Sequence, residues 1–158
     1  QGGKGNEGVA AYVSQLNNTI GYVEYAYAQQ NNLAWVRLQN KDGNFVAPSQ
    51  ESFAAVAENV DWLNTPGMGA ILTNQPGANS WPLTAASFIL LNEEQSRPHK
   101  ARAVLEFFDW VFDHGGDTAI ELSYVPLPPA VVKQIQQLWA QDIQAKDGSV
   151  IWKIDESE

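Results

Sequence analysis

Apolar residues recur every three to four positions in several stretches of the chain, a spacing typical of helices with one face turned to a core. Some of these stretches follow a residue suited to capping a helix start, such as Asn6 or Ser49, and others open on a proline. The glycine pair at 115–116 predicts a left-handed cap after the longest stretch. The predicted helices cover residues 6–16, 25–30, 49–60, 98–114, 118–122 and 129–139.

Other stretches lack the helical spacing and predict extended structure. Residues 20–25 carry aromatic and β-branched side chains, which predicts a strand. Residues 83–91 form the most apolar part of the chain, which predicts a strand buried on both faces. Residues 148–152 predict a further short strand near the end.

Turn residues separate these elements. Asp42-Gly43 lies between extended runs at 33–38 and 44–47, a combination that predicts a hairpin. Residues 64–80 are rich in glycine and proline and predict a loop or a connection between lobes. Because predicted strands alternate with predicted helices, the sequence indicates the α/β class.

The composition excludes several kinds of partner. With 9 Lys and Arg against 18 Asp and Glu, the net charge of -9 disfavours a nucleic-acid backbone and an anionic lipid surface. No stretch approaches the roughly 20 apolar residues of a membrane span, so we expect no membrane insertion. The absence of cysteine excludes disulfides and cysteine-based nucleophiles or metal sites. The start at Gln1-Gly2-Gly3 reads as an internal loop, which predicts a piece of a longer chain.

Signals for catalysis or metal binding are weak. His99 and His114 fall near opposite ends of one predicted helix, about 22 Å apart, so they cannot share an ion. Glu106, Asp109 and Asp113 share an acidic helix face that is better explained by solvation. No Gly-x-Ser-x-Gly motif and no Walker loop occurs. We therefore expect no enzyme, no catalytic residue, no metal and no cofactor.

Two further patterns leave alternatives open. The 6 tryptophans could form a sugar-stacking face, but Trp110 and Trp139 fall on predicted inward helix faces, which favours core packing. The glycine-rich residues 2–5 lead into the first predicted helix, whose free backbone N–H groups could face an anion. Because many helices begin this way, this pattern alone assigns no ligand.

A set of short motifs, in their order and spacing, points to a known family. The motifs lie at residues 3–11 (Gly-Lys-Gly-Asn-Glu-Gly-Val-Ala-Ala), 20–28 (Ile-Gly-Tyr-Val-Glu-Tyr-Ala-Tyr-Ala), 31–34, 74–75, 81–84 (Trp-Pro-Leu-Thr), 88–90, 107–110 (Phe-Phe-Asp-Trp), 122–128 (Leu-Ser-Tyr-Val-Pro-Leu-Pro) and 139. Together they resemble the periplasmic phosphate-binding proteins of bacterial phosphate ABC transporters.

The resemblance implies a two-lobed periplasmic binding protein of class II, the Venus-flytrap fold, of which this chain holds the C-terminal half. Residues 2–80 would be the C-terminal part of the second lobe. Residues 81–86 would be the inter-lobe crossing, and residues 87–154 the returning part of the first lobe.

The resemblance also bears on the ligand. The family's phosphate-binding motifs lie upstream of the position where this chain begins, and no Ser-Gly-Thr occurs here. It therefore assigns no direct phosphate ligand to this chain. Related oxyanion-binding proteins line the cleft at positions that match Asn6, Glu7, Glu24 and Tyr25, and we expect these four residues to face the cleft.

The function that follows is that of a fragment. The parent protein would be periplasmic, capture inorganic phosphate and deliver it to an ABC permease. The alternative is a non-binding structural or interaction fragment, whose fold is completed by the missing N-terminal half or by a second copy of this chain. A third hypothesis, glycan binding, requires several tryptophans exposed on one face.

Overall fold

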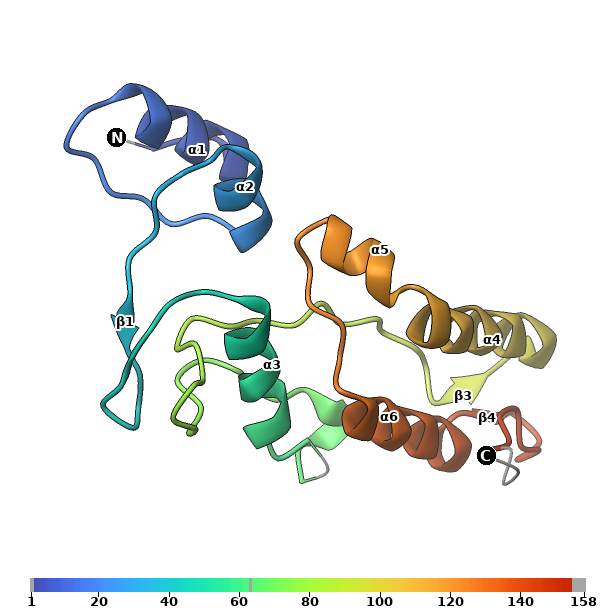
Figure 1. The fold of residues 1–158 in the computed structure, drawn as a ribbon. Helices are drawn as coiled ribbons and strands as arrows, with labels where there is room; N and C mark the ends of the chain where they lie inside the picture. The colour runs from blue at the N-terminus through green and yellow to red at the C-terminus, as the bar shows by residue number, and fades with distance from the viewer. Residues whose placement is uncertain (1, 63, 155–158) are drawn as a thin grey trace.

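The computed structural model describes residues 2–62 and 64–154, so Gln1 lies outside the described residues. Figure 1 shows the path of the chain. The helices are α1 (Gly5–Gln15), α2 (Tyr25–Gln30), α3 (Gln50–Asn59), the 3-10 helix η1 (Pro66–Met68), α4 (Pro98–His114), α5 (Gly116–Glu121) and α6 (Pro129–Asp142). The strands are β1 (Leu38–Gln39), β2 (Phe45–Val46), β3 (Glu94–Gln95) and β4 (Gln144–Ala145).

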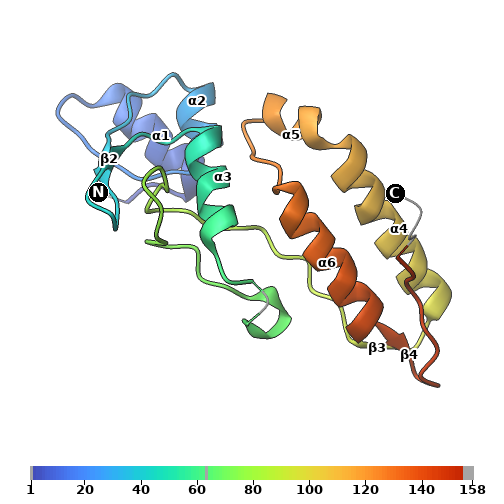
Figure 2. The same cartoon turned by 60° about the horizontal axis from the view of Figure 1, so that its bottom comes forward.

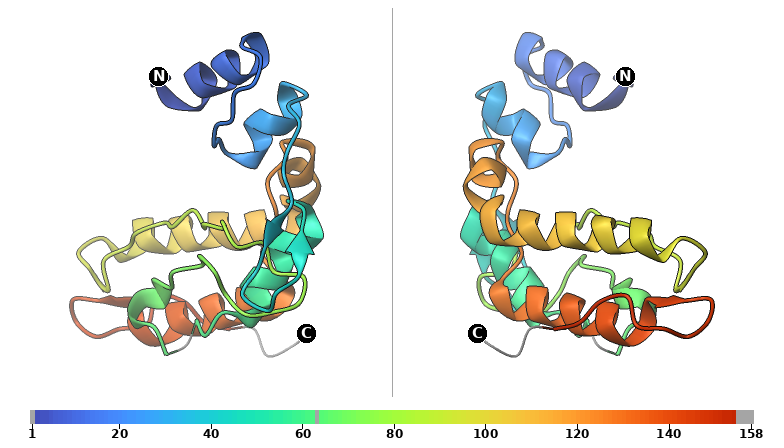
Figure 3. Two further views of the ribbon diagram at one scale, coloured as in Figure 1. Left: turned by 90° about the vertical axis from the view of Figure 1, so that its left-hand side faces the viewer. Right: turned by 90° about the vertical axis from the view of Figure 1, so that its right-hand side faces the viewer.

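The helices divide into two groups in space. Helices α1 and α2 contact each other at one end of the molecule, and α4, α5 and α6 lie toward the other end, with α3 between the two groups (Figures 1 and 3). Helix α6 contacts both α3 and α4, and it runs alongside α4 in Figure 2. The described residues therefore combine helix and strand, as the predicted class requires, although each strand spans only 2 residues.

The helix starts depend on local hydrogen bonds. Ser49 caps α3 as predicted: its Oγ accepts from the Ser52 N–H at 3.2 Å, and the Ser52 hydroxyl accepts from the Ser49 N–H at 2.9 Å. This reciprocal pair satisfies two backbone donors that the first turn leaves free. The prediction that Asn6 caps α1 is wrong, because Lys4 occupies the N-cap position and the Asn6 side chain bonds to a different segment.

The predicted left-handed cap after α4 is also wrong. Gly115 has φ -85° and ψ -5°, which are right-handed values, and the chain passes directly into α5. The glycine is needed there for a close approach instead. A Cβ on Gly115 would lie 2.6 Å from the Val111 carbonyl oxygen, to which the Gly115 N–H donates at 2.8 Å.

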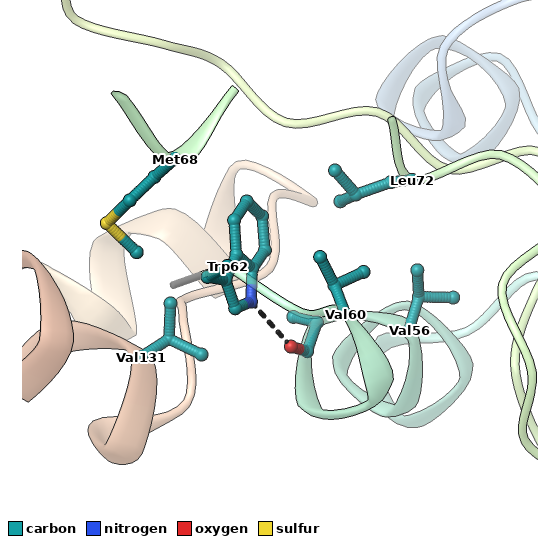
Figure 4. Close-up of a cluster of buried hydrophobic side chains, with 7 residues drawn as sticks. Val56, Val60, Trp62, Met68, Leu72 and Val131 are labelled. Atoms are coloured by element: carbon teal, nitrogen blue, oxygen red, sulfur yellow. Dashed lines mark hydrogen bonds between the residues drawn. The ribbon is translucent and has the colours of Figure 1, made fainter. Parts of the chain in front are cut away.

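One hydrophobic cluster joins α3 to α6. Its buried side chains are drawn in Figure 4 and are Val56, Ala57, Val60, Trp62, Met68, Leu72 and Val131. The indole N–H of Trp62 donates to the Ala57 carbonyl at 2.8 Å, so this buried polar group is satisfied. The cluster packs Val60, Trp62, Met68 and Leu72 against α3.

A second cluster joins α4 to α6. It contains Ala101, Leu105, Trp139, Ile143, Ala145 and Ile151. Ile135 of α6 packs against both clusters, so α6 connects them. The Trp139 ring stacks on Phe112 at 6.0 Å and meets Trp152 edge-on at 5.3 Å.

The predicted hairpin is confirmed and is shorter than expected. Strands β1 and β2 pair antiparallel, and Gly43 in the turn has φ +84°. The buried Asn40 fixes the turn, because its Oδ1 accepts from the Asp42 N–H at 3.1 Å and from the Asn44 N–H at 3.0 Å. Its amide nitrogen donates to the Gly77 carbonyl at 3.0 Å, which ties the hairpin to the predicted loop.

Two predicted strands are not present. Residues 20–24 and 83–91 have no helix or strand, and Tyr22 is 90% and Leu90 91% exposed. The physical reason is that a strand needs a neighbour for its N–H and C=O groups. Neither segment takes part in a ladder with any other part of the described chain.

The end of the chain differs in position from its prediction. The short strand falls at β4, which pairs in parallel with β3, and residues 148–152 contribute a single bridge between Val150 and Gln144. The helices predicted at 25–30 and 118–122 are confirmed as α2 and α5. Within residues 64–80, the predicted loop contains only the short η1.

Candidate functional site

The start of α1 and the segment that leads into α2 lie against each other. The Asn6 Oδ1 accepts from the Glu24 N–H at 3.0 Å, and a Glu7 carboxylate oxygen accepts from the Tyr27 hydroxyl at 3.0 Å. These bonds bring together residues that are far apart in the sequence. Of the four residues expected at a cleft, Asn6, Glu7 and Glu24 therefore share one region of the structure.

Tyr25 points into a different environment. Its ring lies 5.4 Å from Phe53 and 6.3 Å from Trp35, and Phe53 lies 6.5 Å from the ring of the buried Trp81. The Tyr25 hydroxyl also forms a hydrogen bond with Gln29. Tyr25 therefore connects α2 to α3 through an aromatic row.

The region around Glu7 and Glu24 is acidic. Both carboxylates are exposed, and within the described residues neither forms an ion pair. The hydrogen bond to Glu7, followed by the charge of Glu7, raises the pKa of Tyr27 above 10.0. Ionised carboxylates accept hydrogen bonds and supply no donors, so these two side chains alone cannot hold a phosphate anion.

Tyr27 belongs to this region although no sequence pattern predicted it. It falls inside the motif at residues 20–28, yet nothing in the spacing shows that its hydroxyl reaches Glu7. That contact depends on how α2 packs on α1, which is a tertiary feature. The local signal available was only a tyrosine on the face of a short predicted helix.

An open depression of about 760 Å³ lies elsewhere, beside the hairpin and α3. Its charged lining residues are Arg37, Glu51 and Glu58, and none of the four expected cleft residues lines it. Arg37 is engaged, because its guanidinium donates to the Phe45 carbonyl at 2.7 Å. Hydrogen bonds to the backbone N–H of Glu51 and to the Ser49 side chain lower the pKa of Glu51. Two carboxylates and one hydrogen-bonded arginine therefore make up its charged lining.

The acidic face of α4 has structural partners. Arg102 pairs with Glu106 at 2.8 Å, and the Gln136 amide donates to Asp109 at 2.7 Å. Across residues 2–62 and 64–154, no group of three or more His, Cys, Asp or Glu side chains could hold a metal. The His114 ring stacks on Trp110 at 5.2 Å, and its Nδ1 lies 3.0 Å from the Trp110 carbonyl oxygen.

The tryptophans divide between core and surface. Trp62, Trp81 and Trp139 are buried, as core packing predicts. The inward prediction for Trp110 is wrong, since its side chain is 56% exposed and covers the His114 ring instead of the core. Trp35 is also exposed. Its ring contact is with Tyr25 and not with Trp110.

The chain is similar in sequence to known phosphate-binding proteins. A phosphate-binding protein PstS from Pasteurella multocida is 57% identical over 153 residues, which cover 97% of this chain and 44% of that protein. A PstS from Haemophilus influenzae is 57% identical over 91% of this chain and 43% of its own length. The resemblance to phosphate-binding proteins is confirmed.

A more distant PstS relative gives the same result. The protein from Xylella fastidiosa is 50% identical over 90% of this chain and 39% of its own length. This chain therefore spans about two fifths of the length of the PstS relatives that it matches. No protein-family model matches it. None of the described helices is long and apolar enough to cross a membrane.

Proposed function

We propose that this chain is the C-terminal part of a periplasmic solute-binding protein that captures inorganic phosphate and delivers it to an ABC permease. The observation that carries the proposal is the 50–57% identity to PstS proteins over 90–97% of the chain. The relatives are named as binding proteins, so the proposed role is non-enzymatic and requires no cofactor.

The proposed organisation is that of a Venus-flytrap protein. Residues 2–80 would contribute to the second lobe, residues 81–86 would cross between lobes, and residues 87–154 would rejoin the first lobe. The segment around the crossing is well anchored. Trp81 is buried, and its backbone N–H donates to the Ser52 carbonyl at 3.1 Å. The buried Thr84 hydroxyl donates to the Trp81 carbonyl at 2.9 Å.

Within this proposal, Asn6, Glu7, Glu24 and Tyr25 line the cleft without holding phosphate directly. The direct ligands would be backbone amides, hydroxyls and an arginine on the part of the relatives that this chain does not span, since a phosphate is bound best by charge-assisted donors. The hydrogen bond from the Glu24 N–H to Asn6 supports a shaping role, because it fixes the start of α1 against the segment before α2.

Isothermal titration of the isolated chain with phosphate tests where the ligands lie. We expect no heat of binding at phosphate concentrations up to the millimolar range, because the acidic Asn6–Glu24 region supplies too few donors. Sulfate serves as the matched control anion. Micromolar phosphate binding by the isolated chain would contradict the assignment of the ligands to the remainder of the protein.

The alternative of a purely structural fragment is not favoured. The PstS relatives that match this chain over nine tenths of its length are named for phosphate binding. A fragment selected only for association would not need to keep the motifs at 3–11 and 20–28 together with those at 81–84 and 107–110.

A further inference from the structure

Two exposed turns of the chain share one sequence and one backbone pattern. Residues 41–43 and residues 146–148 both read Lys-Asp-Gly. In each turn the glycine N–H donates to the backbone carbonyl three residues before it, at 3.0 Å in the 41–43 turn and 2.8 Å in the 146–148 turn. The two glycines have left-handed φ angles of +84° and +79°. This pattern is typical of a three-residue loop that ends in a glycine bulge.

An aspartate followed by glycine is a chemically reactive pair. The glycine nitrogen can attack the side-chain carbon Cγ of the aspartate, which forms a new N–C bond while a carboxyl oxygen leaves as water with the N–H proton and the carboxyl proton. The cyclic succinimide then takes up a water molecule. Opening at the main-chain carbonyl leaves isoaspartate, in which the main chain runs through Cβ and Cγ. Glycine favours the attack because no Cβ hinders its nitrogen.

The 41–43 turn is tied to a distant segment. The Asp42 carboxylate accepts from the Gly77 N–H at 3.1 Å, across 35 residues of sequence. The buried Asn40, which begins this turn, donates to the carbonyls of Gly77 and Ala78 at 3.0 and 2.9 Å. The Asp42 side chain can therefore approach the Gly43 nitrogen only when contacts with this loop are broken.

The Asp147 carboxylate is held within its own turn. Its Oδ1 accepts from the Ser149 hydroxyl at 2.7 Å and from the Ser149 N–H at 3.0 Å, and among the described residues both of these partners belong to Ser149. Such a bond to the backbone two residues on keeps the carboxyl group beside the following peptide bond. The same bonds lower the pKa of Asp147 and keep it charged, so the attack requires a brief opening of the turn.

Opening of the 146–148 turn breaks few other contacts. The turn projects at one end of the molecule (Figures 1 and 3). Its contact with a distant segment is an exposed ion pair between Lys146 and Glu94 at 3.8 Å, a kind of pair that contributes little to stability. The flanking Ala145 and Ile151 are buried, so the opening is confined to the exposed residues between them.

We infer that Asp147-Gly148 is a site of spontaneous isoaspartate formation in this protein, whereas the same tripeptide at 41–43 is protected by its tie to residues 77–78. The inference does not depend on the proposed function. Isoaspartate lengthens the main chain inside the turn. It therefore disrupts the bond from the Ala145 N–H to the Ser149 carbonyl and the bridge between Gln144 and Val150.

Ageing of the purified chain at neutral pH and body temperature tests the inference. Peptide mass spectrometry, with fragmentation that distinguishes isoaspartate from aspartate, measures the product at each site. We expect isoaspartate to form about tenfold faster at position 147 than at position 42, because Asp42 must first lose a hydrogen bond made to its charged carboxylate by a distant segment. Equal rates at the two sites, or a faster reaction at position 42, would overturn the inference.

Ageing in guanidinium chloride is the control for intrinsic reactivity. Unfolding removes both turns and leaves two Lys-Asp-Gly tripeptides in an open chain, so we expect rates within about twofold of each other. A preference for position 147 that stays as large in the denaturant as in the folded chain would overturn the inference, because the sequence and not the turn would then set the rate.

A substitution at Asn40 tests the source of the protection. Asn40→Ala removes the side chain that ties the 41–43 turn to Gly77 and Ala78, and we expect the rate at position 42 to rise about fivefold while the rate at position 147 is unchanged. Asn79→Ala is the matched control, since Asn79 is exposed in the same loop, and it should change neither rate. An unchanged rate at position 42 in Asn40→Ala would contradict the proposed protection.

Discussion

The α1–α2 pair and the body formed by α3, α4 and α6 are stabilised in different ways. In the pair, Ala10 and Ala26 are the buried helix residues, and the side-chain contacts between the helices include two exposed hydrogen bonds. In the body, two clusters of buried side chains share α6. Burial of apolar surface stabilises the body, whereas the α1–α2 pair buries little apolar surface.

This difference has a consequence for function. Helix α1 has 11 and α2 has 6 residues, and isolated helices of that length are marginal in water. Tyr22, in the segment between the helices, is 90% exposed. The region that the family resemblance places at a cleft is therefore the region that depends most on neighbours, while the body supplies a scaffold.

The largest expected effect comes from the body. Leu105→Ala removes a fully buried side chain of α4, and we expect a loss of about 3 kcal/mol in the free energy of unfolding. Leu90→Ala is the control, because Leu90 is 91% exposed, and its expected effect on the isolated chain is below about 0.5 kcal/mol. Urea denaturation measures both. A similar loss for the two variants would mean that the body is not held by the α4–α6 cluster.

A smaller effect is expected at the junction of the hairpin and the loop. Asn40→Ala leaves the backbone groups of Asp42, Asn44 and Gly77 without their partner, and we expect a loss of about 2 kcal/mol. The exposed Asn79→Ala provides the comparison and should be close to neutral. If the two alanine variants have the same melting temperature, Asn40 does not tie the hairpin to the loop.

Within the α1–α2 pair, Asn6→Ala tests the contact with Glu24. The substitution removes the acceptor for the Glu24 N–H, and we expect a local cost of about 1 kcal/mol. The effect should appear as faster amide exchange at residues 24–28 with the melting temperature of the body unchanged. Asn6→Asp, which keeps an acceptor, should restore slow exchange. A fall in the body's melting temperature would show that the two regions are not independent.

The smallest expected effect is a pH dependence of the stability of the α1–α2 pair. The hydrogen bond to Glu7 raises the pKa of Tyr27 above 10.0, so the folded state favours the neutral phenol. Its contribution is fully present below pH 10 and is lost as the pH rises through the raised pKa. Tyrosinate absorbance should show a late-titrating component that is lost in Tyr27→Phe. Retention of the late-titrating component in that variant would contradict the Glu7–Tyr27 contact.

The helices were predictable from the sequence because their hydrogen bonds close within the segment. Ser49, Pro98 and Pro129 mark starts that the structure confirms, and the amphipathic runs after them need only one apolar partner face. The strands expected at 20–25 and 83–91 could not be judged from the sequence, because a strand's stability depends on a neighbour that no local pattern supplies. The prediction of a left-handed cap at Gly115 was wrong for a related reason. Close contact with Val111, and not a positive φ, explains that glycine.

The candidate site was predictable only in part. The family resemblance named Asn6, Glu7 and Glu24, and the structure brings these residues into one region through the bonds to Glu24 and Tyr27. Tyr27 itself could not be found, because its hydroxyl meets Glu7 only after α2 packs on α1. The same packing turns Tyr25 toward Phe53.

We propose that this chain completes a phosphate-binding protein whose direct ligands lie outside it. Isothermal titration of phosphate into a chimera tests this proposal. In the chimera, this chain replaces the matching 153 residues of the Pasteurella multocida relative. The isolated chain is titrated in parallel. We expect one phosphate bound per chimera, with an affinity within about tenfold of the parent relative, which is 1.4 kcal/mol, and no binding by the isolated chain. A folded chimera that does not bind phosphate, or an isolated chain that does, would contradict it.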